Sequence, residues 1–406
     1  MITSVLMLSP EPPYPMHGGG PYRIASLVHY FSRFASVDLI LISESGQPAN
    51  VPRGLVRSQK IIPLTAHSKS TAARYWRNSR RAVRGVPPLI DRLSGQGPAI
   101  ASAIGQTRYD LGIIEHFWCA PYIREMRDAC ETTLLDLHNV ESVLHERCAA
   151  NSSGLIAAGH KRFAAVSRSL EAELLPRFSS VLATSRDDAE AAGVIAPLAH
   201  IVVYPNALPW IEAPERKEEP AADPLVVFSG NFEYHPNIDA VRFLVSGIWP
   251  RLKERHPELR LRLVGRGDRF IRHLLPANSD IEITGEVPDA LAEIRKATIV
   301  VAPLRIGSGT RIKILEAWAA ARAVVATPLA AEGLTAENGG NIALEASACS
   351  FADMVDRLLS DRVERERLAL AGRRMYERNY TWNAAWQSLE RNLQPACSVQ
   401  LNRYTG

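Results

Sequence analysis

The chain has 406 residues, of which 46% are hydrophobic, 22% are charged and 7% are aromatic. This length suits two domains with separate cores, and the composition excludes a disordered or fibrous protein. A formal net charge of +4 is too small to identify a partner by itself.

The start of the chain and its cysteines indicate a cytoplasmic protein. The run MITSVLMLSPEPP has no basic segment and is too short for the apolar part of a signal peptide, so we interpret it as a strand. No apolar run reaches the length of a membrane-spanning helix. The five cysteines are scattered and form no Cys-x-x-Cys pair, so we expect neither a zinc site nor a disulfide framework. Any contact with the inner face of a membrane is expected to be peripheral.

Short apolar runs alternate with longer helical patterns along the whole chain. The first series is SVLMLS, VDLILIS, LGIIE, TLLDLH, SVLATS and IVVYPN, and the second is PLVVFSG, LRLRLVG, IEITGEV, TIVVAPL, AVVAT and NIALE. This order predicts an α/β protein with two Rossmann-like, doubly wound parallel sheets that carry helices on both faces.

The segment NALPWIEAPERKEEPAAD is rich in proline and charge and is typical of an interdomain linker. We therefore predict domains at residues 1–205 and 206–382, with the boundary near Asn206. The closing pattern YTWNAAWQSLERNLQ predicts an amphipathic helix at about 383–406 that packs back on the first domain, with Trp382 and Trp386 on one face.

A glycine-flanked loop follows the apolar run ATIVVAPLRI and opens GSGTRIKILEAWAAARAVVAT, at residues 307–327. A loop between a strand and a helix often binds anions, because the first N–H groups of a helix have no partner and the dipole adds positive charge. We expect the helix to begin near Gly309. Thr310 and Glu316 would then lie about 9 Å apart along one helix, and Glu316 would share a face with Lys313.

Several longer motifs surround this loop in the carboxy half. They are VVFSGNFEYHPNIDAVRFLV, LRLVGRGD, ITGEVPDALAEIRKATIVVAPL and GSGTRIKILEAWAAARAVVATPLAAEGL, and the last is the most specific. With them the chain resembles the retaining glycosyltransferases of family 4 (glycosyl transferase group 1), which have the GT-B fold. The amino half resembles the family more loosely, through PYPMHGGGPYRIASLVHYFSR and LLDLHNVES.

The resemblance implies that the second domain binds a nucleotide-diphosphate sugar and that the first presents an acceptor hydroxyl. Transfer would take place in the cleft, with retention, without a metal and without a cofactor. It implies catalytic roles for His138, Arg311, Lys313 and Glu316. The implied donor-binding residues are Gly230, Asn231, Gly265, Val287, Gly307, Ser308, Gly309 and Thr310.

Two departures from the family pattern affect the donor site. The family motif has two glutamates separated by seven residues, and Ser308 stands where the first would be. We expect backbone amides around Ser308 and Gly309 to contact the sugar instead. Relatives carry an arginine and a lysine after the strand end at Gly230, whereas this chain has Asn231 and no cation there. Arg311 and Lys313 are the predicted replacements, although Lys313 could instead pair with an exposed Glu316 on the helix surface.

In the amino half, the glycines Gly18, Gly19 and Gly20 follow the first strand and precede a helix predicted to open at Pro21 or Tyr22. Glycines allow the backbone to approach a phosphate or sugar closely, or they form a flexible turn without a ligand. Gly-x-Gly-x-x-Gly is not matched, which disfavours a nicotinamide enzyme.

Polar residues end two predicted strands of the amino half, where α/β sheets place ligand-binding groups. His138 and Asn139 end one strand. The resemblance places the histidine at the donor sugar, with a structural histidine as the alternative, and we expect Asn139, like Gly18 to Gly20 and Glu115, to face the acceptor or a phosphate. Glu115 and His116 end another and could face the acceptor. Asp136 shares a face with His138 and either orients it or lies beside it.

Residues 51–92 contain ten lysines or arginines and one acidic residue, Asp91. TAARYWRNSRRAVR interleaves Tyr75 and Trp76 with arginines, which suits an anionic membrane surface. A polyanionic acceptor, a nucleic acid or a merely solvated helix would fit the same composition.

The sequence thus predicts a metal-independent glycosyltransferase that acts on a glycan, lipid-linked or small-molecule acceptor. Two alternatives remain open: a sugar-nucleotide 2-epimerase of the same fold, and a non-catalytic protein that binds nucleotide-sugars or glycans. The donor base, the sugar and the acceptor are not predicted.

Overall fold

The computed structural model describes residues 2–16, 18–66, 70–213, 224–276, 280–307 and 310–393. The chain divides into two compact units. Unit 1 comprises Met1–Asn206 and Ala385–Gly406, and unit 2 comprises Ala207–Ala384. None of the described helices combines the length and the hydropathy needed to span a bilayer.

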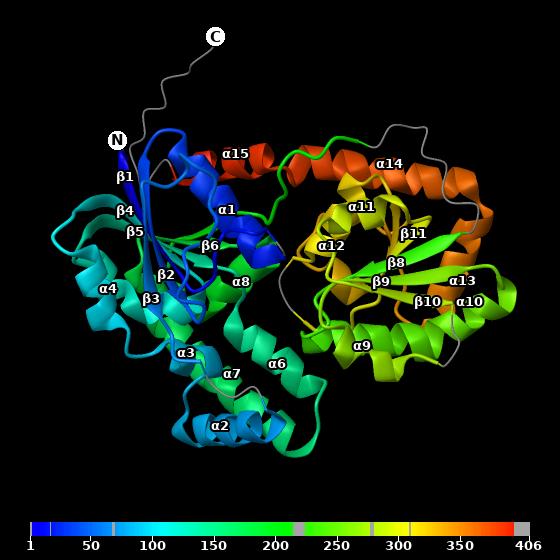
Figure 1. The fold of residues 1–406 in the computed structure, drawn as a ribbon, viewed down its shortest axis with the longest axis horizontal. Helices are drawn as coiled ribbons and strands as arrows, with labels where there is room; N and C mark the ends of the chain where they lie inside the picture. Colours follow the sequence, from blue (N-terminus) through cyan, green and yellow to red (C-terminus); the bar gives the residue numbers. More distant parts are fainter. Residues whose placement is uncertain are drawn as a thin grey trace, which may run out of the picture. The chain divides into compact units, whose positions relative to one another are not determined.

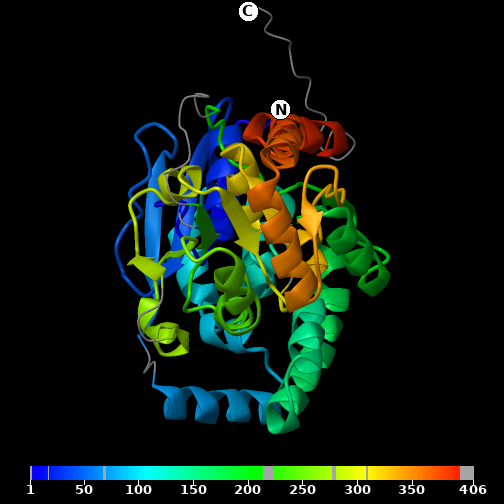
Figure 2. The ribbon, with the colours of Figure 1, turned by 90° about the vertical axis from the view of Figure 1, so that its right-hand side faces the viewer.

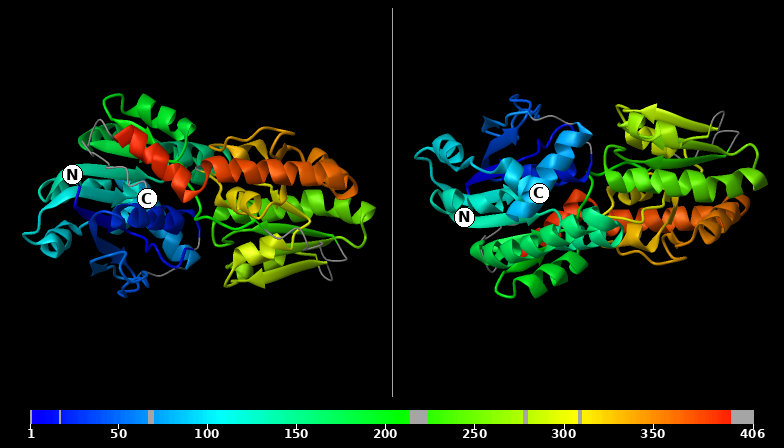
Figure 3. Two further views of the ribbon diagram at one scale, coloured as in Figure 1. Left: turned by 90° about the horizontal axis from the view of Figure 1, so that it is seen from above. Right: turned by 90° about the horizontal axis from the view of Figure 1, so that it is seen from below.

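The described part of unit 1 forms a seven-stranded sheet in the order β3-β2-β1-β4-β5-β6-β7, and every neighbouring pair is parallel. Helices lie on both faces of the sheet (Figures 1 and 3). The strands are β1 Ser4–Ser9, β2 Ser36–Ser43, β3 Ser58–Pro63, β4 Tyr109–Glu115, β5 Cys130–Leu137, β6 Ser180–Ala183 and β7 Ile201–Val203. The helices are α1 Gly19–Ser32, α2 Thr71–Arg84, α3 Pro88–Leu93, α4 Gly97–Ile104, α5 Ile123–Arg127, α6 Glu141–Ala150, α7 Gly154–Leu174 and α8 Arg186–Ile195.

The described part of unit 2 forms a six-stranded sheet in the order β10-β9-β8-β11-β12-β13, again with parallel neighbours only. Its strands are β8 Leu225–Ser229, β9 Arg260–Val264, β10 Ile281–Gly285, β11 Ile299–Ala302, β12 Ala323–Ala326 and β13 Ala343–Leu344. Its helices are α9 His235–Phe243, α10 Trp249–Arg255, α11 Ala290–Arg295, α12 Ile312–Ala319, α13 Ala348–Ser360 and α14 Arg362–Asn379. The predicted doubly wound α/β class is therefore confirmed.

The central strands of each sheet are apolar without alternation because helices cover both of their faces, whereas β3, β9 and β10 carry polar residues. The residues of β1 from Val5 to Leu8 and all of β11 and β12 are buried. In unit 2, helix α14 packs closely on α12 through Gly372, where an added Cβ would lie 2.3 Å from the Trp318 ring. Trp318 is fully buried, and its Nε1 donates to the Asn341 carbonyl at 3.1 Å.

The last helix, α15 Trp382–Leu393, begins in unit 2 and continues into unit 1. Within unit 1, Trp386 Nε1 donates to the carbonyl and the hydroxyl oxygen of Ser26 on α1, at 3.2 and 3.1 Å. The predicted linker lies partly outside the described residues, as do residues 394–406 of the predicted closing helix.

Candidate active site

The order of strands in each sheet reverses at one point, which lies between β1 and β4 in unit 1 and between β8 and β11 in unit 2. In open parallel sheets, ligands bind in the crevice outside the carboxyl ends of the strands at such a point. In unit 2, the predicted residues Gly230 and Asn231 follow β8, and Thr310 and Arg311 follow β11. These four residues therefore follow the two strands that border the switch point of unit 2.

Three glycines pack the strand ends of unit 2 tightly together. Gly230 N donates to the Val264 carbonyl at 2.9 Å, and Gly265 N donates to the Gly285 carbonyl at 3.1 Å. Gly265 has a φ of +136°, and an added Cβ would lie 2.0 Å from the Gly230 carbonyl oxygen. Only glycine fits at this position, because a side chain would meet backbone rather than a movable group.

Lys313 brings a positive charge to this packed region. Its Nζ donates to Asn237 Oδ1 at 2.8 Å and lies 4.2 Å from the centre of the Phe228 ring. A Cβ on Gly230 would lie 3.0 Å from the same Nζ. Burial, and then the Arg311 guanidinium, lowers the pKa of Lys313 to about 7. The ammonium group thus lies beside Gly230, where the chain lacks the cations that the family resemblance leads one to expect.

The start of α12 differs from the prediction. The helix begins at Ile312, and Arg311 caps it in an extended conformation with φ −87° and ψ 98°. The prediction that this helix begins near Gly309 is therefore wrong, and Thr310 lies before the helix rather than within it. The extended residue at Arg311 delays the first turn, so the helical spacing predicted between Thr310 and Glu316 does not apply.

The loop before α12 is compact at both of its described ends. Gly307 has a φ of +128°, and an added Cβ would lie 2.9 Å from Arg311 Nη2, so the guanidinium lies close to the Gly307 backbone. Thr310 is buried, and its Oγ1 has no hydrogen-bond partner within the described part of the chain. The predicted donor residues Ser308 and Gly309 lie outside the described residues.

Glu316 lies one turn after Lys313 on α12 and is half-buried. Burial raises the pKa of its carboxyl group to about 7, the Asp289 carboxylate adds to this, and Lys313 opposes it. Glu316 is therefore not the exposed glutamate of an ordinary helix surface. Val287, also predicted to bind the donor, is half-buried in the loop after β10.

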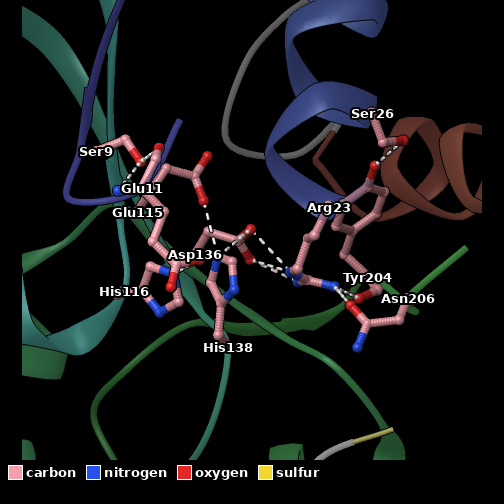
Figure 4. Close-up of polar contacts among 10 residues, drawn as sticks. All are labelled: Ser9, Glu11, Arg23, Ser26, Glu115, His116, Asp136, His138, Tyr204 and Asn206. Carbon is pink, nitrogen blue, oxygen red and sulfur yellow. Dashed lines mark hydrogen bonds and ion pairs between the residues drawn. The ribbon is translucent and has the colours of Figure 1, made fainter. Parts of the chain in front are cut away.

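In unit 1, polar residues at the ends of β4 and β5 form one buried group (Figure 4). His138 Nε2 lies 2.9 Å from Glu115 Oε2 and 3.4 Å from Asp136 Oδ2. The His138 ring stacks on the His116 ring with centroids 3.6 Å apart. Asn139 follows His138 and is half-buried. The polar residues that end the two predicted strands therefore lie in contact. Glu115, which the sequence suggested could face the acceptor, has no exposed surface and contacts His138 instead.

Arg23 on α1 connects this group to the rest of unit 1 (Figure 4). Its Nε donates to both Asp136 carboxylate oxygens, at 2.7 and 2.8 Å, and its Nη1 donates to the Tyr204 carbonyl at 2.6 Å. Arg23 is fully buried. The sequence analysis missed this residue, although an arginine among the apolar residues of PYRIASLVHYF was a usable signal.

Burial sets the protonation of the Glu115–His138 pair. It raises the pKa of Glu115 well above its usual value, and the Asp136 carboxylate adds to this. It lowers the pKa of His138 well below its usual value, with smaller contributions from His116 and Arg23. Burial thus disfavours the charged form of both the Glu115 carboxyl group and the His138 imidazole.

Glu115, Asp136 and His138 are also close enough to share a metal ion, since one ligand atom from each lies within 4.8 Å of the others. The Arg23 guanidinium binds both oxygens of Asp136 and adds a positive charge at that position. This arrangement disfavours a divalent cation in the group.

The glycine-rich segment of unit 1 also differs from the prediction. Helix α1 begins at Gly19, directly after Gly18, whose φ is +96°. The prediction that the helix begins at Pro21 or Tyr22 is therefore wrong. Gly19 and Gly20 therefore belong to the first helical turn rather than to a loop. A Cβ on Gly20 would lie 2.2 Å from Glu11 Oε2, so glycine leaves room for that side chain at the strand end.

His116 follows Glu115 at the switch point of unit 1, where the sequence suggested only that it could face the acceptor. It is buried, and its φ of +64° is uncommon for a residue other than glycine. Its Nε2 lies 3.4 Å from Glu11 Oε2 (Figure 4). The sequence placed His116 at the end of a strand but gave no sign that it lies close to Glu11.

Residues 223–361 match the family described as Glycosyl transferases group 1. No curated protein matches the chain significantly. Among solved structures, sucrose-phosphate synthase (tll1590) from Thermosynechococcus elongatus is 17% identical with a TM-score of 0.72, covering 97% of this chain and 100% of that one.

Two further solved structures are similar over almost the whole chain. Anabaena Alr3699/HepE in complex with UDP and glucose is 13% identical with a TM-score of 0.65, covering 96% of this chain and 99% of that one. The trehalose-6-phosphate structure from E. coli with bound UDP-2-fluoro glucose is 14% identical with a TM-score of 0.66, covering 97% and 99%. The chain therefore has the GT-B fold, and this fold together with the domain match supports a glycosyltransferase.

Proposed function

We propose that the protein transfers a sugar from a nucleotide-diphosphate donor to an acceptor hydroxyl with retention at the anomeric carbon, as the retaining enzymes of family 4 do. The observation that carries this proposal is the Lys313 ammonium beside Gly230 at the switch point of unit 2. A cation held against closely packed backbone at strand ends suits a diphosphate, which also accepts hydrogen bonds from backbone N–H groups.

In this proposal the donor diphosphate lies between the Gly230–Asn231 turn and the loop before α12. Lys313 and Arg311 supply positive charge, and the buried Thr310 hydroxyl, which lacks a described partner, supplies a hydrogen bond. Glu316 accepts hydrogen bonds from the ribose hydroxyls, which requires its carboxylate form. Backbone amides near Ser308 and Gly309 contact the sugar, and Gly265 and Val287 border the nucleotide.

The proposed reaction breaks the bond between the anomeric carbon and the diphosphate oxygen and forms a bond to the acceptor oxygen on the same face of the sugar. The acceptor proton passes to the departing phosphate oxygen, so no protein nucleophile is needed. Negative charge grows on the diphosphate during this step. A fixed ammonium and guanidinium stabilise that charge more in the transition state than in the bound substrate.

The residues of unit 1 take the acceptor side of the reaction in this proposal. His138 contacts the sugar that is transferred, the Glu115 carboxyl group holds the His138 ring in place, and Asn139 faces the acceptor. The helix start at Gly18 to Gly20 lies next to Glu11 and His116, and these side chains bind the acceptor. We also propose that transfer needs no metal and no cofactor, because the protein supplies its own cations.

The test uses the purified full chain with a panel of nucleotide-sugars and simple hydroxyl acceptors. UDP-sugars are tried first, because similar structures contain UDP or UDP-sugars. Nuclear magnetic resonance of the product reports the anomeric configuration, which we expect to match that of the donor. Lys313→Met should strongly lower the rate of product formation, and substitution of an exposed lysine, Lys296→Met, serves as the matched control.

Three outcomes would contradict the proposal. A product of inverted configuration would exclude retention. Isomerisation of the donor sugar with no gain of mass on any acceptor would indicate a 2-epimerase. Tight donor binding with neither transfer nor hydrolysis would indicate a non-catalytic binding protein.

A further inference from the structure

The basic segment 51–92 is only partly neutralised by ion pairs in the described structure. Arg57 pairs with Asp38, and Arg92 Nη2 lies 2.7 Å from Glu44. Helix α2 is fixed from its inner side, where Arg81 Nε lies 2.8 Å from Asp91 Oδ2. The helix is therefore docked on unit 1 by one face, and its other face is exposed.

The exposed face of α2 is not simply polar. Trp76, Arg80 and Val83 are spaced at helical intervals and share this face. The exposed fractions of Trp76 and Val83 are 67% and 83%. The Arg80 guanidinium lies over the Trp76 ring, 6.0 Å from its centre. Two large apolar side chains and an arginine on one outward face are unexpected for a helix that only contacts water.

A second exposed apolar site lies at the same end of unit 1. Leu155 and Ile156, at the start of α7, are 92% and 50% exposed. Figures 1 and 2 both place α2 and the turn between α6 and α7 at this end. The carboxyl end of α2 contacts α7, since a Cβ on Gly85 would lie 3.7 Å from Val166. We call Trp76, Arg80, Val83, Leu155 and Ile156 together the α2–α7 surface.

We propose that the α2–α7 surface docks on an anionic lipid bilayer. Tryptophan and arginine side chains prefer the level of lipid headgroups, and leucine, isoleucine and valine gain from the apolar layer beneath it. The excess of basic residues in 51–92 complements the negative charge of such a surface. A nucleic acid would match the charge but would leave Val83, Leu155 and Ile156 without an apolar environment.

The test measures sedimentation of the full chain with lipid vesicles. Phosphatidylcholine vesicles are compared with vesicles that also contain phosphatidylglycerol, at low and high salt. We expect binding to the anionic vesicles only, with a loss at high salt. Arg80→Gln should weaken binding about fivefold, which corresponds to about 1 kcal/mol per basic residue near an anionic surface.

Apolar substitutions separate this proposal from simple charge attraction. The double variant Trp76→Ser, Val83→Ser should weaken vesicle binding at least about tenfold. The matched control is Val194→Ser, Leu198→Ser, because Val194 on α8 and Leu198 just after it are 78% and 89% exposed but lie outside the α2–α7 surface. The control should bind vesicles like the unchanged protein. Circular dichroism and the melting temperature verify that all variants fold.

Equal binding to neutral and anionic vesicles would overturn the proposal, and so would unchanged binding of the double variant. Binding to a single-stranded oligonucleotide without binding to vesicles would overturn it in favour of a nucleic-acid partner. Affinity of the same variants for UDP reports on the donor site in unit 2. This separates failure of membrane docking from failure of the proposed function.

Discussion

Lys313 and Glu316 lie one turn apart on α12, and burial moves their pKa values toward each other. The pKa of Lys313 falls to about 7 and that of Glu316 rises to about 7. Donor binding as proposed needs the ammonium form of Lys313 and the carboxylate form of Glu316. Raising the pH above 7 removes the first, and lowering it below 7 removes the second, so donor affinity should be greatest near neutrality.

A diphosphate should also change the protonation of Lys313. An anion beside the ammonium favours the charged form and raises its pKa. Above neutral pH, where the phosphates are already ionised, binding of a nucleoside diphosphate should therefore take up a proton. Calorimetry in two buffers of different ionisation enthalpy measures this uptake.

Lys313→Met supplies the control for that measurement, because it has no group to protonate at this position. It should bind the nucleotide more weakly and without proton uptake. Binding of the unchanged protein without proton uptake would show that Lys313 does not contact the phosphates.

Glu115 and Asp136 lie in one buried group but should respond differently to removal of their charge. Burial favours the neutral form of Glu115 by raising its pKa, so Glu115→Gln, which is also neutral, should change the free energy of unfolding little. Asp136→Asn leaves the Arg23 guanidinium buried without its carboxylate and should cost about 3–5 kcal/mol. Urea unfolding at neutral pH measures both.

The matched control is Glu173→Gln, which removes an exposed partner of Arg177. Exposed pairs contribute at most about 1 kcal/mol. A cost for Asp136→Asn no greater than that for Glu115→Gln would contradict the assigned charges.

The short apolar or alternating runs of the sequence predicted twelve of the strands. Most of them are continuously apolar, as parallel strands covered on both faces are, while β9 and β10 alternate apolar with polar residues. Strand β3 was missed because Ser58, Gln59 and Lys60 precede its apolar residues. This strand lies at the edge of the sheet, where one side is not paired and polar residues are tolerated.

Helix starts were less predictable than strands. The sequence does not show that Glu11 lies against Gly20 near the start of α1. It also does not show that the backbone of Arg311 is extended just before α12. For the same reason the sequence indicated Asp136 and Lys313 but did not show that Arg23 and Asn237 are their partners. Local pattern identifies residue types at strand ends, whereas side-chain contacts depend on distant segments.

The packed strand ends of unit 2 make a prediction at the scale of elements. Gly265→Ala would place a Cβ against the Gly230 carbonyl, and Gly285→Ala would place one in open space at a similar positive φ of +71°. Both pay conformational strain, but Gly265→Ala adds a backbone clash. We expect it to lower the free energy of unfolding by about 1–3 kcal/mol more than Gly285→Ala.

Thermal or urea unfolding of the two variants decides this comparison. Equal losses of stability would mean that the loops after β8 and β9 can separate without cost. The close packing of the Gly230 turn would then not be required to position Lys313.

At the scale of the whole molecule, each unit presents polar residues at the switch point of its own sheet. Unit 2 presents the cations Arg311 and Lys313, and unit 1 presents buried carboxyl groups, imidazoles and an arginine that is paired with Asp136. Since the proposed reaction draws its positive charge from Arg311 and Lys313, turnover should persist in EDTA. Loss of activity that magnesium or manganese restores would show that a metal supplies this charge.

Steady-state turnover of Arg311→Ala and Lys313→Ala at saturating donor, beside the control Lys296→Ala, tests the proposed donor site most directly. We expect Arg311→Ala to lower turnover by roughly 10² to 10³, as removal of one transition-state hydrogen-bond donor does. We expect a somewhat smaller loss for Lys313→Ala and none for the control. Arg311→Lys should also be impaired, because lysine cannot reproduce the bidentate contact of a guanidinium. Near-normal turnover of both alanine variants would contradict the claim that these residues hold the departing diphosphate.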